Sequence, residues 1–492
     1  MPKRPDAAKG RMWWIAALLV LLLLLGLHGM RMSALHGWSD DGSAYLRHAL
    51  NLLEGRPYTA VSYAALGDLP PPVMYPPGLP VMLVPLIKLW GMNFLVFKIA
   101  MLVVFLLSVA VSLAALLRTW PKWIALAAVA LLAVDANVGL QNEHINSDFL
   151  ALLWIGGLVW VLEGFDWRQC SGTALAWRSG VTVALLLLAI ETRSVNAVLL
   201  GAIPIYSFWR YRKFPLFSWV PVVATTALLW LLRQPGSSSS GGANYLKYFS
   251  GITYVTLRRN AIQYALSLSD FIGLAPAGFA RLIALAAIGC ALYGAYRIIQ
   301  TSKPFWLLLM ALYAMILLLW PFSDPERYIV PFLPMLLACF VYGIVELAAL
   351  LPERIGLLVK VVVPLLAIVA SARAYVMTPP LNGGLNYPAT LEMYRAVERL
   401  TGPESVIAFR KARSLSLFTD RHSVGYNYVD STVMRHDFCA GGVTHVVSGP
   451  AVFPDDEQFL EPFLAGGAKG GFDLLYRNEQ FSVYTVKLEC TR

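Results

Sequence analysis

The sequence predicts an all-α polytopic membrane domain followed by a small mixed α/β domain. Of its 492 residues 58% are hydrophobic and only 14% are charged, and the mean hydropathy is +0.61. A soluble chain has no need of so much apolar surface, whereas a helix crosses the hydrocarbon layer with about 20 apolar residues. Apolar segments of this kind recur up to residue 377, after which charged residues become frequent. We therefore expect a transmembrane domain at 1–377 and a soluble domain at 378–492.

About eleven segments are predicted to span the membrane: 12–30, 94–117, 121–140, 149–163, 176–191, 194–209, 216–233, 272–297, 304–322, 329–350 and 356–376. Lysine and arginine recur in alternate loops, from Lys3 and Arg4 before the first span to Arg354 before the last. The positive-inside rule places these loops and the N-terminus in the cytoplasm, and the C-terminal domain outside. The net charge of +10 largely reflects this topology, so we do not expect a nucleic-acid partner.

The first outer loop, residues 31–93, is predicted to carry two helices that lie in the membrane interface. The first covers 41–54, where helical spacing puts four residues on one face: Tyr45, Ala49, Leu52 and Leu53. Arg47, His48 and Asn51 then point elsewhere. The second is the apolar stretch Leu79–Trp90, which is too short to span comfortably. Amphipathic or short apolar helices of this kind lie along the interface and do not cross it.

Two adjacent carboxylates, Asp40 and Asp41, directly follow the first span. An ionisable pair so close to the bilayer costs free energy, which makes it a candidate functional site. The alternative is a structural role, because Asp or Ser ahead of a helix commonly accepts hydrogen bonds from free backbone N–H groups. One side chain is enough for such a cap, so the sequence leaves both interpretations open.

Further polar residues are expected at the same outer level of the membrane. They are Lys98, Glu143, His144, Asp148, Arg193, Arg258, Arg327 and Tyr328. Each alone fits a cap or a cation that reaches toward the interface. Together they suit an amphiphile with an anionic head group, because the planar guanidinium of arginine can bind two phosphate oxygens at once.

The C-terminal segment is predicted to mix helix and strand. Residues 388–400 have helical spacing, and four segments have the composition of strands: Ser405–Phe409, Val424–Val429, Thr444–Val447 and Phe481–Val486. Cys439 and Cys490 both fall here, and an oxidising compartment permits a disulfide between them. Spacing alone does not decide whether they pair.

An ordered set of motifs resembles the C-type (GT-C) polytopic glycosyltransferases. The nearest by motif are the dolichyl-phosphate-mannose–protein mannosyltransferases and the bacterial lipid A aminoarabinose and lipopolysaccharide-core transferases. The matching elements are Asp40-Asp41 with Tyr45, the segment Ala49–Gly55, Tyr75-Pro76-Pro77-Gly78, Ser147-Asp148, Thr192-Arg193, and Arg327-Tyr328 with Pro331 and Pro334. The resemblance covers roughly residues 12–350.

This resemblance implies a bacterial inner-membrane enzyme that takes a sugar from a polyprenyl-phosphate donor. The acceptor is a lipid, a glycan or a protein at the outer face, and the anomeric carbon is usually inverted. The family acid lies four residues before the tyrosine, so Asp41 is the expected general base and Asp40 is its alternative. Arg327 and Arg193 are expected to hold the donor phosphate, with Arg258 and Lys98 as further contacts. The remaining polar and aromatic residues are expected to line the cavity: Tyr45, Tyr75, Glu143, His144, Asp148 and Tyr328.

One position departs from the family pattern. The residue before Pro76-Pro77 is His or Lys in many members, whereas Tyr75 carries no positive charge here. Arg258 or Lys98 is expected to compensate. A metal is left open, because adjacent carboxylates can bind Mg²⁺ or Mn²⁺ and members of the family differ in this requirement.

Two other classes of protein share some of these features. A transporter or flippase for a lipid-linked glycan also needs interfacial cations, but it should show paired repeats with broken helices near the midplane, and no internal symmetry is visible. A non-catalytic scaffold leaves the polar residues of the outer loops unexplained. The sequence therefore favours the glycosyltransferase.

Overall fold

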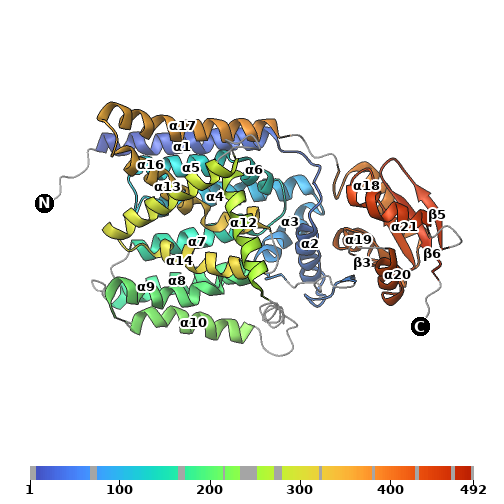
Figure 1. Ribbon diagram of the computed structural model, residues 1–492. Coiled ribbons are helices and arrows are strands. Elements are labelled where there is room, and N and C mark those ends of the chain that lie inside the picture. Colours follow the sequence, from blue (N-terminus) through green and yellow to red (C-terminus); the bar gives the residue numbers. More distant parts are fainter. Residues whose placement is uncertain are drawn as a thin grey trace. The chain divides into compact units, whose positions relative to one another are not determined.

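The computed structural model describes residues 7–66, 75–164, 172–213, 216–232, 252–270, 280–320, 324–378, 383–426, 431–466 and 471–488. The chain forms two compact units (Figure 1). Unit 1 comprises Met1–Met32, Ile99–Asn142 and Ser147–Thr378, and unit 2 comprises Ser33–Lys98, Glu143–Asn146 and Pro379–Arg492. The first outer loop therefore groups with the C-terminal segment. The domain boundary expected after residue 377 therefore stays a prediction.

Unit 1 is helical, and every predicted span contains a helix. The elements are α1 (Ala7–Met30), α4 (Phe94–Leu116, whose first residues belong to unit 2), α5 (Lys122–Val134), α6 (Ala136–Asn142), α7 (Asp148–Glu163), α8 (Gly172–Thr192), η2 (Ser194–Ala197), α9 (Val198–Tyr211), α10 (Leu216–Leu232), α12 (Tyr254–Asp270), α13 (Ala280–Thr301), α14 (Phe305–Leu319), α15 (Pro325–Tyr328), η3 (Val330–Phe332), α16 (Leu333–Ala348) and α17 (Glu353–Met377). The long helices run roughly parallel to one another (Figure 1). The sequence did not predict α12, which lies between the predicted spans 216–233 and 272–297 and is rich in polar residues.

Fewer helices meet the requirements of a full span than the eleven predicted. Among the described residues four are long and apolar enough: α4, α8, Val330–Ala348 and α17. The pair α5 and α6 counts as a fifth, bent by 60°. The bend has a local cause: Asp135 is extended, and its carboxylate accepts a hydrogen bond from the Val138 N–H at 2.9 Å, which caps α6. The multi-pass prediction is confirmed, and the count of eleven is not reached.

Helices α13 and α16 approach each other closely through glycine. A Cβ atom at Gly294 or at Gly343 would overlap the backbone of the facing helix, at Cys339 and Cys290 respectively. Small residues let helix backbones come together in this way inside membranes, where packing replaces the hydrophobic effect as the driving force.

Unit 2 contains a mixed six-stranded sheet of order β1-β3-β2-β4-β6-β5. Its strands are β1 (Tyr63–Ala65), β2 (Val406–Ala408), β3 (His422–Gly425), β4 (His445–Ser448), β5 (Phe472–Arg477) and β6 (Ser482–Val486). The first four strands in this order pair in parallel, and β6 and β5 continue the sheet antiparallel. The strands predicted around β2, β4 and β6 are confirmed, and β3 begins earlier than predicted. Neither β1 nor β5 was predicted, and β1 has too few residues for a detectable alternation.

Helices cover both faces of this sheet. On β2, Ile407 packs with Met393 of α18 (Pro388–Leu400) and Leu415 of α19 (Ala412–Thr419). The next residue, Ala408, packs with Phe438 of α20 (Ser431–Ala440) and Phe463 of α21 (Glu461–Gly466). This alternation gives three layers, α/β/α, and confirms the mixed α/β prediction. Cys439 forms a disulfide, and Cys490 lies outside the described residues.

The two predicted helices of the first outer loop are α2 (Asp40–Leu53) and α3 (Gly78–Trp90). Burial on α2 follows the predicted apolar face only in part. Tyr45 and Ala49 are buried, but so are Arg47, His48 and Asn51, while Leu52 and Leu53 are exposed. Hydrogen bonds explain this burial. Arg47 donates to the Ser416 carbonyl at 2.6 Å, and Asn51 donates to the Ala60 carbonyl at 2.7 Å. The polar face of α2 thus packs against the rest of unit 2, where backbone carbonyls accept hydrogen bonds from its side chains.

Candidate functional site

Asp40 and Asp41 occupy the first turn of α2, and neither is its N-cap. That role belongs to Ser39, whose hydroxyl oxygen accepts a hydrogen bond from the Gly42 N–H at 3.1 Å. Negative charge in the first turn of a helix is stabilised by the free N–H groups there. The two carboxylates are therefore available for other contacts, and the structure gives each a different one.

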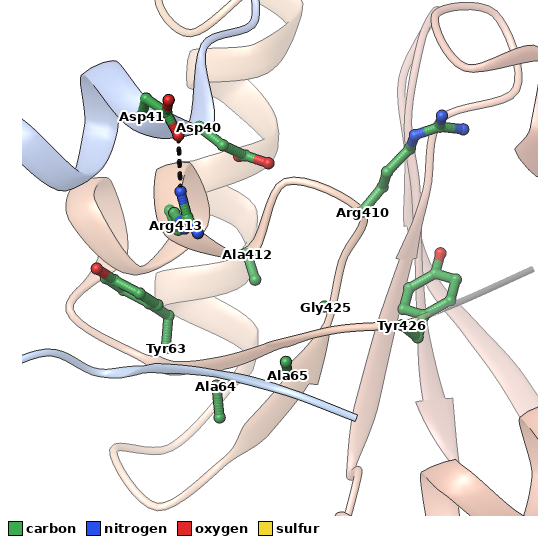
Figure 2. A pocket seen from close by; sticks show the side chains of 10 residues that line it. All are labelled: Asp40, Asp41, Tyr63, Ala64, Ala65, Arg410, Ala412, Arg413, Gly425 and Tyr426. Atoms are coloured by element: carbon green, nitrogen blue, oxygen red, sulfur yellow. Dashed lines mark hydrogen bonds and ion pairs between the residues drawn. The ribbon is translucent and has the colours of Figure 1, made fainter. Parts of the chain in front are cut away.

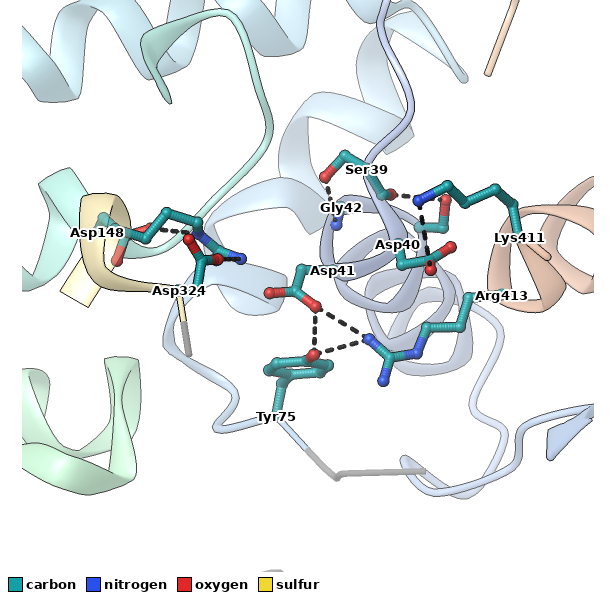
Figure 3. Close-up of polar contacts among 11 residues, drawn as sticks. Ser39, Asp40, Asp41, Gly42, Tyr75, Asp148, Asp324, Lys411 and Arg413 are labelled. Atoms are coloured by element: carbon teal, nitrogen blue, oxygen red, sulfur yellow. Dashed lines mark hydrogen bonds and ion pairs between the residues drawn. The ribbon is translucent and has the colours of Figure 1, made fainter. Parts of the chain in front are cut away.

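Asp41 belongs to a closed triangle of polar contacts with Tyr75 and Arg413 (Figure 3). The Tyr75 hydroxyl donates to Asp41 Oδ1 at 2.5 Å, and Arg413 Nη1 donates to the same oxygen at 2.9 Å. Arg413 also donates to the Tyr75 hydroxyl oxygen at 2.8 Å. Burial and the neighbouring Asp41 raise the pKa of Tyr75 well above 10, so the phenol keeps its proton and remains a donor.

The cation beside Tyr75 is Arg413, and the expectation that Arg258 or Lys98 compensates in binding phosphate stays a prediction. Lys98 is 1% exposed and donates to the Leu35 carbonyl at 2.6 Å. Arg258 is exposed on α12 and forms no ion pair with any described residue. Sequence reasoning missed Arg413 because it lies 338 residues after Tyr75, and no motif surrounds it.

Asp40 faces a cavity of about 320 Å³ within unit 2 (Figure 2). Its Oδ2 atom lies 3.8 Å from Lys411 Nζ, which is a loose ion pair. The lining residues come from the start of α2, from β1, from the end of β3, and from the segment that leads into α19. They are Asp40, Asp41, Tyr63, Ala64, Ala65, Arg410, Ala412, Arg413, Gly425 and Tyr426.

Three other predicted cavity residues lie in unit 2. Tyr45 is buried and packs its ring on Tyr75, with the ring centroids 4.7 Å apart. Glu143 and His144 belong to the short segment Glu143–Asn146, where the His144 ring lies 5.5 Å from the ring of His36. None of these three residues lines the cavity beside Asp40.

His36 itself was not predicted as a site residue, and it is fully buried. Its Nδ1 donates to the Gly37 carbonyl at 2.7 Å, and its Nε2 accepts from the Ile145 N–H at 3.2 Å. This pattern requires the neutral imidazole. Burial, reinforced by His144, lowers the pKa of His36 to about 3.

A second charged cluster lies in unit 1, around Asp148 at the start of α7. This carboxylate is 0% exposed, forms an ion pair with Arg193, and lies 3.2 Å from Arg327 Nε. Arg327 Nη1 also contacts Asp324 Oδ2 at 3.3 Å, and the guanidinium of Arg193 lies 5.3 Å from the centre of the Tyr328 ring. The structure thus brings together three of the sequence motifs: Ser147-Asp148, Thr192-Arg193 and Arg327-Tyr328.

The acidic residues are a poor fit to a divalent cation. Among the residues that the structure describes, no three His, Cys, Asp or Glu side chains are grouped as a metal site requires. Asp41 is held by a guanidinium and a phenol, and Asp40 lies beside an ammonium group. A bound Mg²⁺ or Mn²⁺ would have to displace these donors and would find too few oxygens. No step of the mechanism below uses a metal.

Solved structures share this architecture over most of the chain. The archaeal oligosaccharyltransferase AglB from Archaeoglobus fulgidus, in complex with an inhibitory peptide and a dolichol-phosphate, superposes with a TM-score of 0.62 at 12% identity, over 90% of this chain and 70% of its own. ArnT from Cupriavidus metallidurans, bound to undecaprenyl phosphate, has a TM-score of 0.57 at 14% identity, over 96% and 98%. The chain has the GT-C membrane glycosyltransferase fold. The fold implied by the sequence motifs is thereby confirmed.

A third GT-C structure also matches. It is the mycobacterial arabinofuranosyltransferase AftD, a mutant form of which gives a TM-score of 0.55 at 12% identity, with 97% of this chain covered and 42% of AftD. No family model and no curated protein matches the chain by sequence. The GT-C assignment therefore rests on structure, because so little sequence identity remains.

Proposed function

We propose that the chain is an inner-membrane glycosyltransferase that moves a sugar from a polyprenyl-phosphate donor to an acceptor hydroxyl at the outer face. The observation that carries this proposal is the Asp41 carboxylate, which borders a polar cavity in a chain of GT-C fold. The GT-C structures with a bound dolichol-phosphate in AglB and undecaprenyl phosphate in ArnT support the donor class. Lysine and arginine in alternate loops support an N-terminus in the cytoplasm and a C-terminal domain in the periplasm.

In the proposed reaction Asp41 acts as the general base. It takes the proton from the acceptor hydroxyl while the acceptor oxygen attacks the anomeric carbon of the donor sugar. The bond between that carbon and the phosphate oxygen breaks, and polyprenyl phosphate departs with the bonding electrons. Attack from the face opposite the leaving group inverts the anomeric carbon. Tyr75 and Arg413 fix the orientation of the Asp41 carboxylate through the contacts described above.

Arg193 and Arg327 are proposed to hold the donor phosphate as it leaves. A guanidinium is a planar fork whose geometry matches two phosphate oxygens at once. Asp148 then orients both arginines, and this supports the role that the motifs imply. Cations placed in advance where negative charge develops lower the barrier to bond cleavage.

The test is a turnover assay of the purified full-length protein with labelled polyprenyl-phosphate sugars and acceptor extracts. Asp41→Asn keeps the shape of the side chain and removes the base, so transfer should fall by about 10² to 10⁴-fold. Asp40→Asn should cost less, and Glu54→Gln, an exposed residue beyond the end of α2, is the matched control. Retained turnover in both Asp40→Asn and Asp41→Asn removes the base assignment. Movement of the intact donor across proteoliposomes without a covalent product replaces the enzyme with the flippase.

A further inference from the structure

Residues 34–37 lead into α2 and are called the entry segment here; they form neither helix nor strand. Each of the four backbone carbonyls in this segment nevertheless accepts a hydrogen bond from the protein. The donors are, in chain order, Asn386 Nδ2 at 2.7 Å, Lys98 Nζ at 2.6 Å, the Leu385 N–H at 2.8 Å and His36 Nδ1 at 2.7 Å. Outside helices and sheets, backbone groups are paired with side chains, other backbone or water. Because protein atoms take that place here, the path of the entry segment is set by its neighbours.

Asn386 binds the entry segment with both ends of its side-chain amide. Its Nδ2 donates to the Ala34 carbonyl at 2.7 Å, and its Oδ1 accepts from the His36 N–H at 2.7 Å. The neighbouring Leu385 N–H donates to the His36 carbonyl at 2.8 Å. An asparagine side chain suits this arrangement because it carries a donor and an acceptor together, as a peptide group does. Two adjacent residues from the far end of the chain therefore fix the backbone on both sides of Leu35.

The two backbones also approach each other closely at Gly384. A Cβ atom at this position would lie 2.0 Å from the His36 carbonyl oxygen and 2.8 Å from the Cα atom of Gly37. Only a residue without a side chain allows such an approach. The segment that contains Gly384 and Asn386 thus has a shape that matches the entry segment at the level of the main chain.

The entry segment continues into the first turn of α2 without a loose residue. Trp38 packs its ring beside Phe453 in the core of the sheet, with the ring centroids 5.2 Å apart. Ser39 then caps α2 by accepting from the Gly42 N–H at 3.1 Å (Figure 3). Asp41 is the second residue after this cap. Because the cap fixes where the helix begins, the direction of the entry segment helps to set the direction in which the Asp41 side chain leaves the helix.

We propose that Asn386 is a positioning residue for the transfer reaction, which holds the entry segment so that the Asp41 carboxylate points at the acceptor hydroxyl. Asn386 itself touches neither Asp41 nor the reacting atoms, so its effect passes through the backbone of residues 34–41. This inference rests on the proposed function and goes beyond it, because it gives a residue of the C-terminal segment a role in the rate of transfer. A misdirected base weakens the transition state and leaves donor binding unchanged, so kcat should fall while KM for the donor stays the same. The competing interpretation is that Asn386 contributes to stability alone.

The experiment compares Asn386→Ala with Asn478→Ala in the full-length protein. Asn478 is a matched control, because it also donates to a backbone carbonyl, that of Ala389 at 2.8 Å, and accepts from a backbone N–H, that of Phe481 at 2.8 Å. Both of these partners lie outside the entry segment. In the turnover assay described above, Asn386→Ala should lower kcat by about 10 to 100-fold with an unchanged KM for the donor. Asn478→Ala should keep the kcat of the wild type.

Hydrogen exchange gives a second readout that needs no substrate. The N–H groups of Gly42 and Ser43 both donate to Ser39, so a peptide that covers residues 39–46 reports on the first turn of α2. Exchange in this peptide should become about tenfold faster in Asn386→Ala and stay unchanged in Asn478→Ala. Gly384→Ala should act in the same direction as Asn386→Ala by displacing the His36 carbonyl. Gly402→Ala is its control, because a Cβ atom there would have no neighbour within 4 Å.

Asn386 is only partly buried, so its alanine variant is expected to fold, and a thermal melt verifies this. A wild-type kcat in Asn386→Ala overturns the proposal. An equal loss of kcat in Asn478→Ala does so too, because the effect would then be one of general stability. A loss of kcat without faster exchange in residues 39–46 also overturns it, since the effect would not pass through α2. Failure of the proposed function appears elsewhere, as donor turnover that survives Asp41→Asn.

Discussion

The chain has two carboxylate centres that look alike in sequence and differ in environment. Asp148 in unit 1 is 0% exposed and is held by two arginines. The side chain of Asp41 in unit 2 is 23% exposed, shares one arginine with a tyrosine, and borders a cavity. A carboxylate enclosed by cations is well suited to orient them and poorly suited to accept a proton. The comparison shows that the two carboxylates differ in burial and in the number of their cationic partners, which fits the orienting role proposed for Asp148 and the reacting role proposed for Asp41.

The same comparison explains why charge in the sequence could not by itself separate the roles proposed for the two centres. A buried ion pair loses its hydration, so its members must satisfy each other closely. A partly exposed acid keeps room for a substrate, and its partners only need to fix its direction. Asp148 therefore forms one cluster of ion pairs with Arg193 and Arg327, whereas Asp41 borders a cavity.

The largest expected effect is on stability, from Asp148→Asn. The substitution leaves two largely buried guanidinium groups without their shared anion, which should lower the free energy of unfolding by about 3–5 kcal/mol. The measurement is thermal unfolding of the full-length protein in detergent. Asp324→Asn is the matched control, because Asp324 also pairs with Arg327 but its side chain is 40% exposed. Equal losses in the two variants would contradict the distinction drawn here.

The second prediction concerns His36, a buried imidazole in unit 2 that is neutral in the folded protein. Its pKa falls from about 6.5 in the unfolded chain to about 3 in the folded protein. Below pH 6.5 the unfolded state binds the extra proton, so stability should fall as the pH decreases toward 3. Between pH 6.5 and 5 the loss should be about 2 kcal/mol.

His36→Gln tests this prediction, because an amide has both a donor and an acceptor and does not titrate. Melting temperatures of the wild type and the variant should be compared across pH 5 to 7.5 in one detergent. The variant should show a shallower slope in this window. Parallel slopes would mean that other groups cause the acid dependence.

The smallest expected effect comes from Tyr75→Phe, which removes two of the three contacts around Asp41 and keeps the ring. Because burial raises the pKa of Tyr75 well above 10, the folded protein retains this proton after the unfolded chain has lost it. Stability should therefore fall as the pH rises above 10, by about 1 kcal/mol at pH 11, and the variant should lack this contribution.

Transfer activity gives Tyr75→Phe a second readout. Loss of a hydrogen bond that orients Asp41 should reduce turnover by about tenfold, which is far less than the loss in Asp41→Asn. Tyr58→Phe is a suitable control, because its hydroxyl donates to the backbone carbonyl of Tyr75 and not to Asp41. A turnover loss in Tyr75→Phe as large as that in Asp41→Asn would make the phenol part of the chemistry.

Much of unit 1 was predictable because its signals are local. A long apolar segment must become a helix in lipid, where each backbone polar group has to be paired within the segment. Predicted helices therefore coincide with observed ones, for example 94–117 with α4 and 356–376 with α17. The bend at Asp135 was missed, since a single capping side chain sets it.

Unit 2 was predictable only in part, because its signals are distant along the chain. The strand β1 pairs with β3 from the far end of the sequence, Tyr63 lying opposite Ser423. A segment of three residues has too little pattern to be recognised alone. The burial of Arg47 on α2 has the same origin, because its partners come from residues 416 and 420.

The sequence by itself determined that this is a helical membrane protein with a small α/β domain and a pair of acidic residues after its first helix. It did so because apolar length and residue spacing act within one segment. Only the tertiary structure decided that Arg413 stands beside Asp41 and Tyr75, and that Asp40 faces a cavity. Those neighbours come from segments hundreds of residues apart, and their proximity results from sheet pairing and packing, which no local pattern encodes.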